Sequence, residues 1–244
     1  MIDRAVRAQA RGFVGDVVLL GMAVAAFVLS LSLATSIPPE FAAAPADARA
    51  ALTAPFSAVL ATYGAILAAV YGAFRHTLDL RDGVIAQRLT MQHRWTLLLV
   101  RAPSSALGGA GVALAGVLGG HTALAVAMGG VPVDGRSFGA TLAVGAAAGL
   151  WGMGLGIIVQ AHLVAPFVAS LSMGAAMLVA MFWGAGAVYL PLLALLEAFG
   201  FDLSVVGILP EDRLDSPLAV LVASGWVLAA LAVGGASFMN RDVT

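Results

Sequence analysis

The 244-residue sequence has no cysteine, no lysine and few charged residues of either sign. Without cysteine, the chain forms no disulfide, thiolate metal site or cysteine nucleophile. Without lysine, it contains no GxxxxGK[ST] phosphate loop, so it does not bind ATP in the usual way. Only 10% of the residues are charged and 61% are hydrophobic, whereas soluble domains carry about 25% charged residues. This balance excludes an ordinary soluble protein, and it equally excludes a disordered chain.

Motifs for metal binding and catalysis are also missing. The four histidines are scattered, and none stands at metal-ligand spacing from another: His76, His93, His121 and His162. No nucleophile-elbow serine and no HExxH pair occurs. The formal net charge of −1 gives no indication of nucleic-acid binding. We therefore expect no enzymatic activity, no metal or cofactor on this chain, and no nucleic-acid partner.

Long apolar runs dominate what the sequence does contain. A helix that crosses a membrane needs about 20 apolar residues. Six stretches qualify, and none contains aspartate, glutamate or arginine: 17–36, 56–74, 102–126, 138–159, 165–189 and 217–238. A charged residue at the centre of such a helix would cost about 2.5–3.5 kcal/mol. The sequence therefore predicts an all-α membrane protein with six transmembrane helices, in which residues 1–244 form a single transmembrane domain.

The arginines predict how this domain is oriented. If the N-terminus is cytoplasmic, nine arginines lie on the inside: Arg4, Arg7, Arg11, Arg75, Arg81, Arg88, Arg94, Arg101 and Arg241. Three lie outside: Arg49, Arg136 and Arg213. Cytoplasmic segments are enriched in basic residues. We therefore expect a multi-pass protein with both termini in the cytoplasm.

The first residues have an amphipathic pattern. Within 2–13, one helical stripe is apolar and another face carries Arg4, Arg7 and Arg11. Such a segment is typical of a helix lying in the membrane interface, with its arginines at the lipid phosphates. Two interpretations stay open at this point: a simple topological anchor and a functional connecting helix.

The segment 75–101 between the second and third runs holds five of the twelve arginines. It is too long for a tight turn. Thr77 or Asp79 is a candidate helix cap, and Gly83 is a candidate helix breaker. Its apolar residues form two edges, so one edge can pack on the membrane domain while the other presents a surface to a partner. The alternative is a solvated basic loop that only fixes topology.

Two further features are unusual. The run 190–201 is apolar but only about 12 residues long, which is typical of a re-entrant or interfacial helix; an ordinary external loop is the alternative. The fourth run contains two small-xxx-small pairs, Gly145 with Gly149 and Gly152 with Gly156. Such pairs let helix backbones approach closely, and we expect packing within this chain in preference to a dimer seam.

No acidic residue lies within the apolar runs, so the sequence shows no carrier for a proton- or sodium-driven mechanism.

The sequence layout resembles the membrane subunit, or permease, of ABC-2 type ABC transporters. The resemblance rests on six spans with inside termini and on two short motifs. The first is Leu80-Arg81-Asp82-Gly83-Val84-Ile85 followed by Gln92-His93-Arg94 and Arg101. The second is the ending Phe238-x-x-Arg241-Asp242-Val243, similar to an F-x-R-R-D ending common in these permeases.

The resemblance implies a specific machine. Residues 2–13 would form the connecting helix, and 79–88 a cytoplasmic coupling helix that fits a cleft on an ATPase subunit. The residues implied in coupling are Asp79, Arg81, Asp82, Gly83, Arg88 and Arg94, with Asp79 and Asp82 as alternative counterparts of the family's acidic residue. Residues 190–201 and their continuation would be outward-facing re-entrant helices.

The implied assembly pairs this chain with a second permease, identical or homologous, and with two ATPase subunits that bind ATP and Mg²⁺. It would export a hydrophobic or amphipathic cargo (drug, peptide or lipid-like) across a bacterial cytoplasmic membrane. The alternative function is a membrane scaffold or assembly protein whose basic loop binds a cytoplasmic partner without transport.

Overall fold

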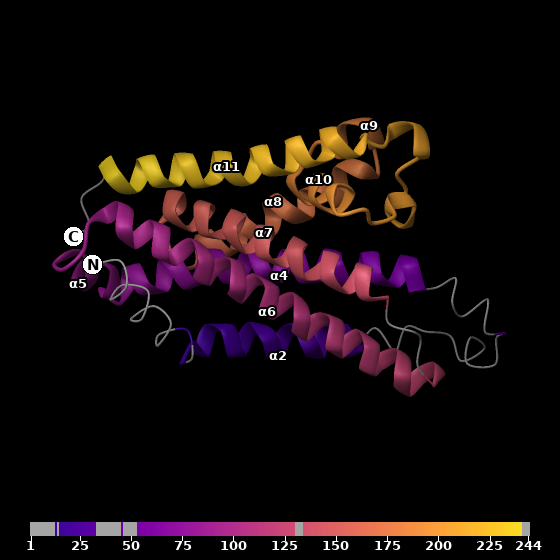
Figure 1. Cartoon of the computed structure of the whole chain (residues 1–244), viewed down its shortest axis with the longest axis horizontal. Helices are drawn as coiled ribbons and strands as arrows, with labels where there is room; N and C mark the ends of the chain where they lie inside the picture. Colours follow the sequence, from indigo (N-terminus) through magenta and orange to yellow (C-terminus); the bar gives the residue numbers. More distant parts are fainter. Residues whose placement is uncertain (1–12, 14, 33–44, 46–52, 130–133, 241–244) are drawn as a thin grey trace.

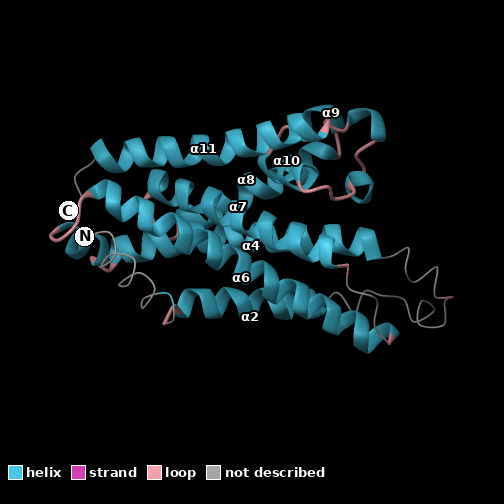
Figure 2. Cartoon of the chain, in the orientation of Figure 1, coloured by secondary structure: helices cyan, strands magenta, loops and turns pink. Residues whose placement is uncertain are grey.

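A computed structural model describes residues 13, 15–32, 45, 53–129 and 134–240. Every regular element in these ranges is a helix, and no strand occurs among them (Figure 2). The predicted all-α class is therefore confirmed. Arg4, Arg7, Arg11 and the ending 241–244 lie outside the described residues, as does most of the predicted interface helix.

Four helices are long and apolar enough to cross a membrane. They are α4 (Thr53–Arg81), α6 (Arg94–Met128), α7 (Gly135–Val159) and α11 (Ser216–Asn240). Two more apolar helices are shorter, α2 (Val17–Ser32) with 16 residues and α8 (Val164–Ala180) with 17. At 1.5 Å per residue they reach about 24 and 26 Å, against a hydrocarbon core of about 30 Å. Four of the six predicted spans thus have the length and composition expected.

The six helices lie side by side along the long axis of the molecule, and successive ones run in alternating directions (Figure 1). In this view α2 forms one edge of the bundle and α11 the opposite edge. The short helix α5 (Val84–Leu89) lies at one end, which we call the α5 end. The short helices α9 (Gly184–Ala187) and α10 (Pro191–Ala198) lie at the other, the α10 end.

Helix α7 is the centre of the packing, in contact with α4, α6, α8 and α11. Its glycines make this possible. Gly145 and Gly149 lie against α6, where a Cβ on either would press on the backbone of Gly109. Gly152 lies against α4, where a Cβ would overlap the carbonyl oxygen of Ala69. The prediction that these small-residue pairs serve packing within the chain is confirmed.

The outer surface of the bundle is apolar. On α11, Leu221 is 67% exposed and Leu228 64%; on α2, Val17, Leu20 and Val24 are all more than half exposed. Contiguous apolar surface of this extent marks contact with lipid or with another protein. The structure thus supports a membrane protein in the same way as the composition does.

Three predicted boundaries were wrong. Helix α4 continues to Arg81 instead of ending at 74, and α6 begins at Arg94 instead of 102. The supposed loop 75–101 is therefore mostly helix, and only 82–93, which contains α5, connects the two. Helix α8 ends at Ala180 and not near 189. There the backbone leaves the helical region at Trp183 (φ −152°, ψ 83°), and α9 begins at the next residue.

Candidate functional site

Four charged side chains meet inside the α5 end: Asp16, Arg75, Asp79 and Arg101. We call them the ion cluster. Arg75 Nε lies 2.8 Å from Asp16 Oδ2. The Asp79 carboxylate binds Arg75 through one oxygen and Arg101 through the other. Asp16, Asp79 and Arg101 are buried, so the cluster is an internal feature of the bundle.

The local sequence explains how each member is positioned. Asp16 precedes α2, and its Oδ1 accepts a hydrogen bond from Leu19 N (3.1 Å) as a helix N-cap does. Tyr71, Arg75 and Asp79 follow each other at spacings of four on α4, so they lie on one helical stripe. The Tyr71 hydroxyl donates a hydrogen bond to Asp16 Oδ2 (3.1 Å). Arg101 approaches from α6. Three helices are therefore joined by one set of polar contacts.

The charges of the cluster balance, with two carboxylates and two guanidinium groups. A buried ion without a partner is costly, and removing one member of a buried pair typically destabilises a protein by about 3–5 kcal/mol. Changing the distance between α2, α4 and α6 at this end would separate these charges. The cluster therefore favours movement of the three helix ends as one body.

Sequence reasoning placed Asp79 among the residues that contact a partner, and the structure does not support that placement. Asp79 is only 5% exposed, and both of its carboxylate oxygens are used inside the chain. The roles of Asp16, Tyr71, Arg75 and Arg101 were missed. The available signal was the spacing of four along α4, together with opposite charges at the ends of neighbouring apolar runs.

Helix α5 packs on the ends of the longer helices through one apolar patch. Ile85 is fully buried in a cluster with Leu97 and Leu98 of α6, Met153 and Ile157 of α7, and Phe238 of α11. Gly83 precedes the helix with φ +72°, a conformation that glycine adopts without strain. Helix α5 therefore shares one apolar cluster with residues of α6, α7 and α11.

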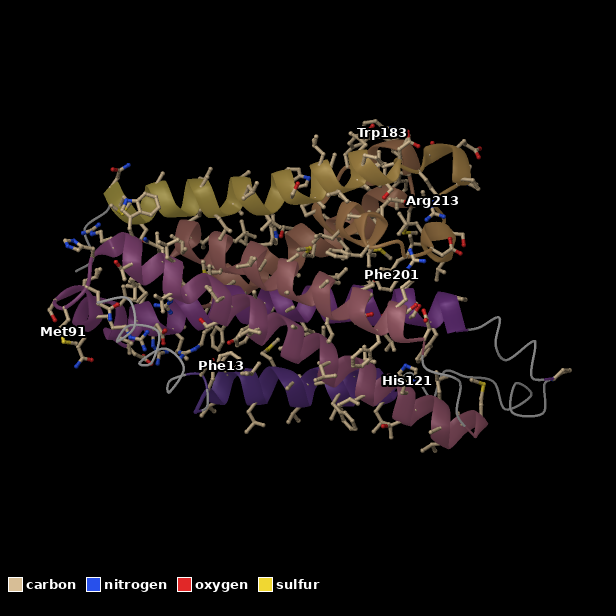
Figure 3. All side chains as sticks on the ribbon, viewed as in Figure 1. Phe13, Met91, His121, Trp183, Phe201 and Arg213 are labelled. Atoms are coloured by element: carbon tan, nitrogen blue, oxygen red, sulfur yellow. The ribbon has the colours of Figure 1, made fainter. Side chains whose placement is uncertain are left out.

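The other side of this connection faces outward. Arg81 and Asp82 form an exposed ion pair (Nε–Oδ1 3.1 Å), with side chains 57% and 48% exposed. Arg88 is half-buried in the last turn of α5. Met91, after α5, and Trp95, in the first turn of α6, are also exposed, and Figure 3 shows Met91 at the extremity of the α5 end. We call these accessible charged and apolar side chains the α5 surface.

Arg94 is turned toward its own chain and caps α11. Its Nη1 donates to the carbonyl oxygens of Phe238 (2.7 Å) and Met239 (3.2 Å), and its guanidinium lies over the Phe238 ring. A cationic side chain at a helix C-terminus donates hydrogen bonds to the last carbonyl oxygens, which lack partners within the helix, and it interacts favourably with the helix dipole. Of the six predicted coupling residues, the structure leaves Arg81, Asp82 and Gly83 exposed, Arg88 half-buried, and Asp79 and Arg94 bound internally.

The α10 end has a different construction. All residues of α10 from Pro191 to Glu197 are buried. Arg213 donates to Glu197 (3.1 Å) and to the carbonyl oxygen of Phe201 (3.0 Å), which ties the following loop to α10 (Figure 3). Hydrogen bonds from the backbone N–H and the hydroxyl of Ser204 lower the pKa of Asp202 in this loop. The predicted run 190–201 is thus a short buried helix with a compact return.

Neither end contains a recognisable metal centre: within the described ranges, no three histidine or carboxylate side chains are grouped as metal ligands. No model of a known protein family matches the chain, and no curated protein matches its sequence.

Proposed function

We propose that this chain is the membrane subunit of an ATP-driven exporter of the ABC-2 type, coupled to a soluble ATPase through the α5 surface. The observation that carries the proposal is the construction of the α5 end. A short helix follows an exposed ion pair, and its Ile85 is buried in an apolar cluster that contains residues of α6, α7 and α11. Such an element can pass a displacement from a partner to several long helices at once.

The ion cluster supports a rigid transmission. A push on α5 reaches α4 and α6 directly, because α5 connects them, and Asp79 binds arginines from both. Asp16 extends the unit to the start of α2. Rigid-body movement of this helix group would open or close a path at the interface with a second chain, which is a common way for a partner to drive a membrane domain.

The distribution of charge supports the orientation. Among the described residues, five arginines lie toward the α5 end and two toward the α10 end: Arg75, Arg81, Arg88, Arg94 and Arg101 against Arg136 and Arg213. Because basic residues are enriched on the cytoplasmic side, this distribution supports a cytoplasmic α5 end. The α10 end then faces outward, with α10 and the residues that follow it as the re-entrant segment, and α2 and α8 complete the set of six spans.

The assembly we propose contains two permease chains, identical or homologous, and two ATPase subunits that bind ATP and Mg²⁺ in a bacterial cytoplasmic membrane. Energy comes from phosphoryl transfer on the ATPases, with no cofactor on this chain. Inside the bundle the charged side chains are confined to its two ends, and the middle is apolar. This composition favours a hydrophobic or amphipathic cargo, since a buried charge would need a partner.

Charge reversal on the α5 surface tests the proposal. Asp82→Arg and Arg88→Glu should each abolish ATPase association and transport while membrane insertion stays normal, because they place repulsive charges in the contact. The matched control is Glu211→Arg, an exposed carboxylate at the α10 end, which should leave association unchanged. Normal ATPase association in both α5 variants would contradict the proposal.

A scaffold that binds another cytoplasmic protein is the second candidate. The specific observation in its favour is the exposure of Met91 (69%) and Trp95 (58%) in the α5 surface, because apolar and charged groups together are typical of protein contacts in general. The identity of the bound protein distinguishes the two functions: a partner without a nucleotide site would favour the scaffold.

A further inference from the structure

Beside the ion cluster lies a small polar cavity of about 10 Å³. Phe13, Ser104 and Ser105 line it together with the side chains of the cluster and its neighbours: Asp16, Tyr71, Arg75, His76 and Arg101. Helices α4 and α6 and the residues that precede α2 therefore all contribute to its wall. A buried water needs roughly 10–15 Å³ of such space, so the cavity has room for one water molecule.

Three nitrogen atoms around this cavity have no hydrogen-bond partner within the described part of the chain: His76 Nδ1, His76 Nε2 and Arg101 Nη1. Both side chains are almost completely buried, with exposures of 2% and 3%. Buried polar groups are nearly always hydrogen-bonded, and each one left unmade costs about 1–3 kcal/mol. Leaving three such atoms unpaired next to a polar cavity would be unusual for a native bundle.

The chemistry of these atoms defines what fits. Arg101 Nη1 only donates hydrogen bonds, whereas a neutral imidazole has one donor and one acceptor nitrogen. An anion only accepts, and it would also face the carboxylate of Asp16 in the same wall. A metal cation would face two guanidinium groups. Water both donates and accepts, so it alone serves the arginine and either nitrogen of the imidazole.

We propose that this cavity is a binding site for one ordered water molecule that joins Arg101 to His76. The water accepts from Arg101 Nη1 and bonds to the imidazole, with the Ser105 hydroxyl in the same wall as a third polar group. It extends the ion cluster to His76, whose ring packs edge-to-face on Phe238 of α11 (centroids 6.4 Å apart). The polar contacts of α2, α4 and α6 then include the ring that packs on the end of α11.

Radiolytic hydroxyl labelling of the full chain in lipid nanodiscs tests the site, because X-rays generate the radical from bound water itself. His76, Tyr71 and Phe238 are equally inaccessible, with exposures of 2%, 1% and 1%, but only the first two line the cavity. We expect label on His76 and Tyr71 and none on Phe238. All three residues remaining unlabelled would overturn the proposal.

A cavity-filling variant sharpens the test. Ser105→Val places two methyl groups at the cavity wall and should remove the label from His76. The matched control, Ser224→Val at an exposed position on α11, should keep it. Label on His76 that persists in Ser105→Val would overturn the assignment, because the radical would then come from another water. Label on His76 that appears only when chloride is replaced by sulfate would also overturn it, because chloride and not water would then be the occupant.

Discussion

The two ends of the bundle are stabilised by different interactions. At the α5 end, four charged side chains from three helices neutralise each other in the interior. At the α10 end, the buried helix Pro191–Ala198 packs through leucines, and a single partly exposed arginine, Arg213, ties the loop to it. Apolar packing tolerates small sliding movements, whereas a buried ion cluster resists separation of its charges. The comparison indicates a stiff end that transmits movement and a softer end that can rearrange.

We expect the largest effect from a substitution that disrupts the ion cluster at the stiff α5 end. Asp79→Ala leaves the buried guanidinium group of Arg101 and the half-buried one of Arg75 without their shared carboxylate and should lower the free energy of unfolding by about 3–5 kcal/mol. Chemical unfolding in mixed micelles measures it. The control is Asp82→Ala, whose ion pair is exposed and contributes about 1 kcal/mol or less. Similar losses in the two variants would show that the cluster does not hold the helices together.

The next effect concerns the middle of the bundle, which connects the two ends. In Gly152→Ala the new Cβ overlaps the Ala69 carbonyl, a backbone atom that cannot turn aside, and overpacking of this kind costs about 1–3 kcal/mol. Gly139→Ala on the same helix meets nothing within 4 Å and should instead stabilise the helix by about 0.5–1 kcal/mol. Thermal unfolding of the two variants should therefore shift in opposite directions, and equal shifts would argue against close α4–α7 packing.

A matched change at both ends compares them directly. Glu197→Gln removes the carboxylate charge at the α10 end. There the side chain of Arg213 is 32% exposed, and it keeps its hydrogen bond to the carbonyl oxygen of Phe201. We expect a loss of at most about 1 kcal/mol because solvent screens the pair. The corresponding change Asp79→Asn at the α5 end should cost several times more in the same unfolding assay. A larger loss at the α10 end would reverse the comparison.

The smallest effect is a pH dependence of the loop at the α10 end. Because its hydrogen bonds from Ser204 lower the pKa of Asp202, the carboxylate stabilises the folded loop fully above the unfolded value of about 3.9, and this contribution is lost as the pH falls further. Hydrogen exchange of Ser204 should quicken below that pH relative to loops without a carboxylate cap. Asp202→Asn should remove this dependence; an unchanged profile would contradict the role of the cap.

The sequence predicted the features that depend on near neighbours. Helical class, the apolar runs and the packing role of Gly145 and Gly152 follow from composition and local spacing. The ion cluster depends on partners far apart, since Tyr71 reaches back 55 residues to Asp16 and Arg101 reaches 22 residues to Asp79. A hydropathy window stops at each of these charges, which is why α4 and α6 were predicted too short.

The coupling residues show the same limit. Arg94 lies in a basic segment and was assigned to a partner contact, but its acceptor is a carbonyl 144 residues away at the end of α11. No local pattern reveals such a pairing. Asp82 and Arg81, whose ion pair is between adjacent residues, are exposed as a surface contact requires. The candidate site was therefore predictable where its residues face solvent and unpredictable where they turn inward.

The central claim is that the α5 surface binds an ATPase. The most direct measurement is gentle purification of the tagged chain from its native membrane, followed by mass spectrometry of what comes with it. We predict a stoichiometric soluble subunit that carries a phosphate-binding loop, present with the unaltered chain and absent with Asp82→Arg. Repeated recovery of the chain without any nucleotide-binding subunit would contradict the account.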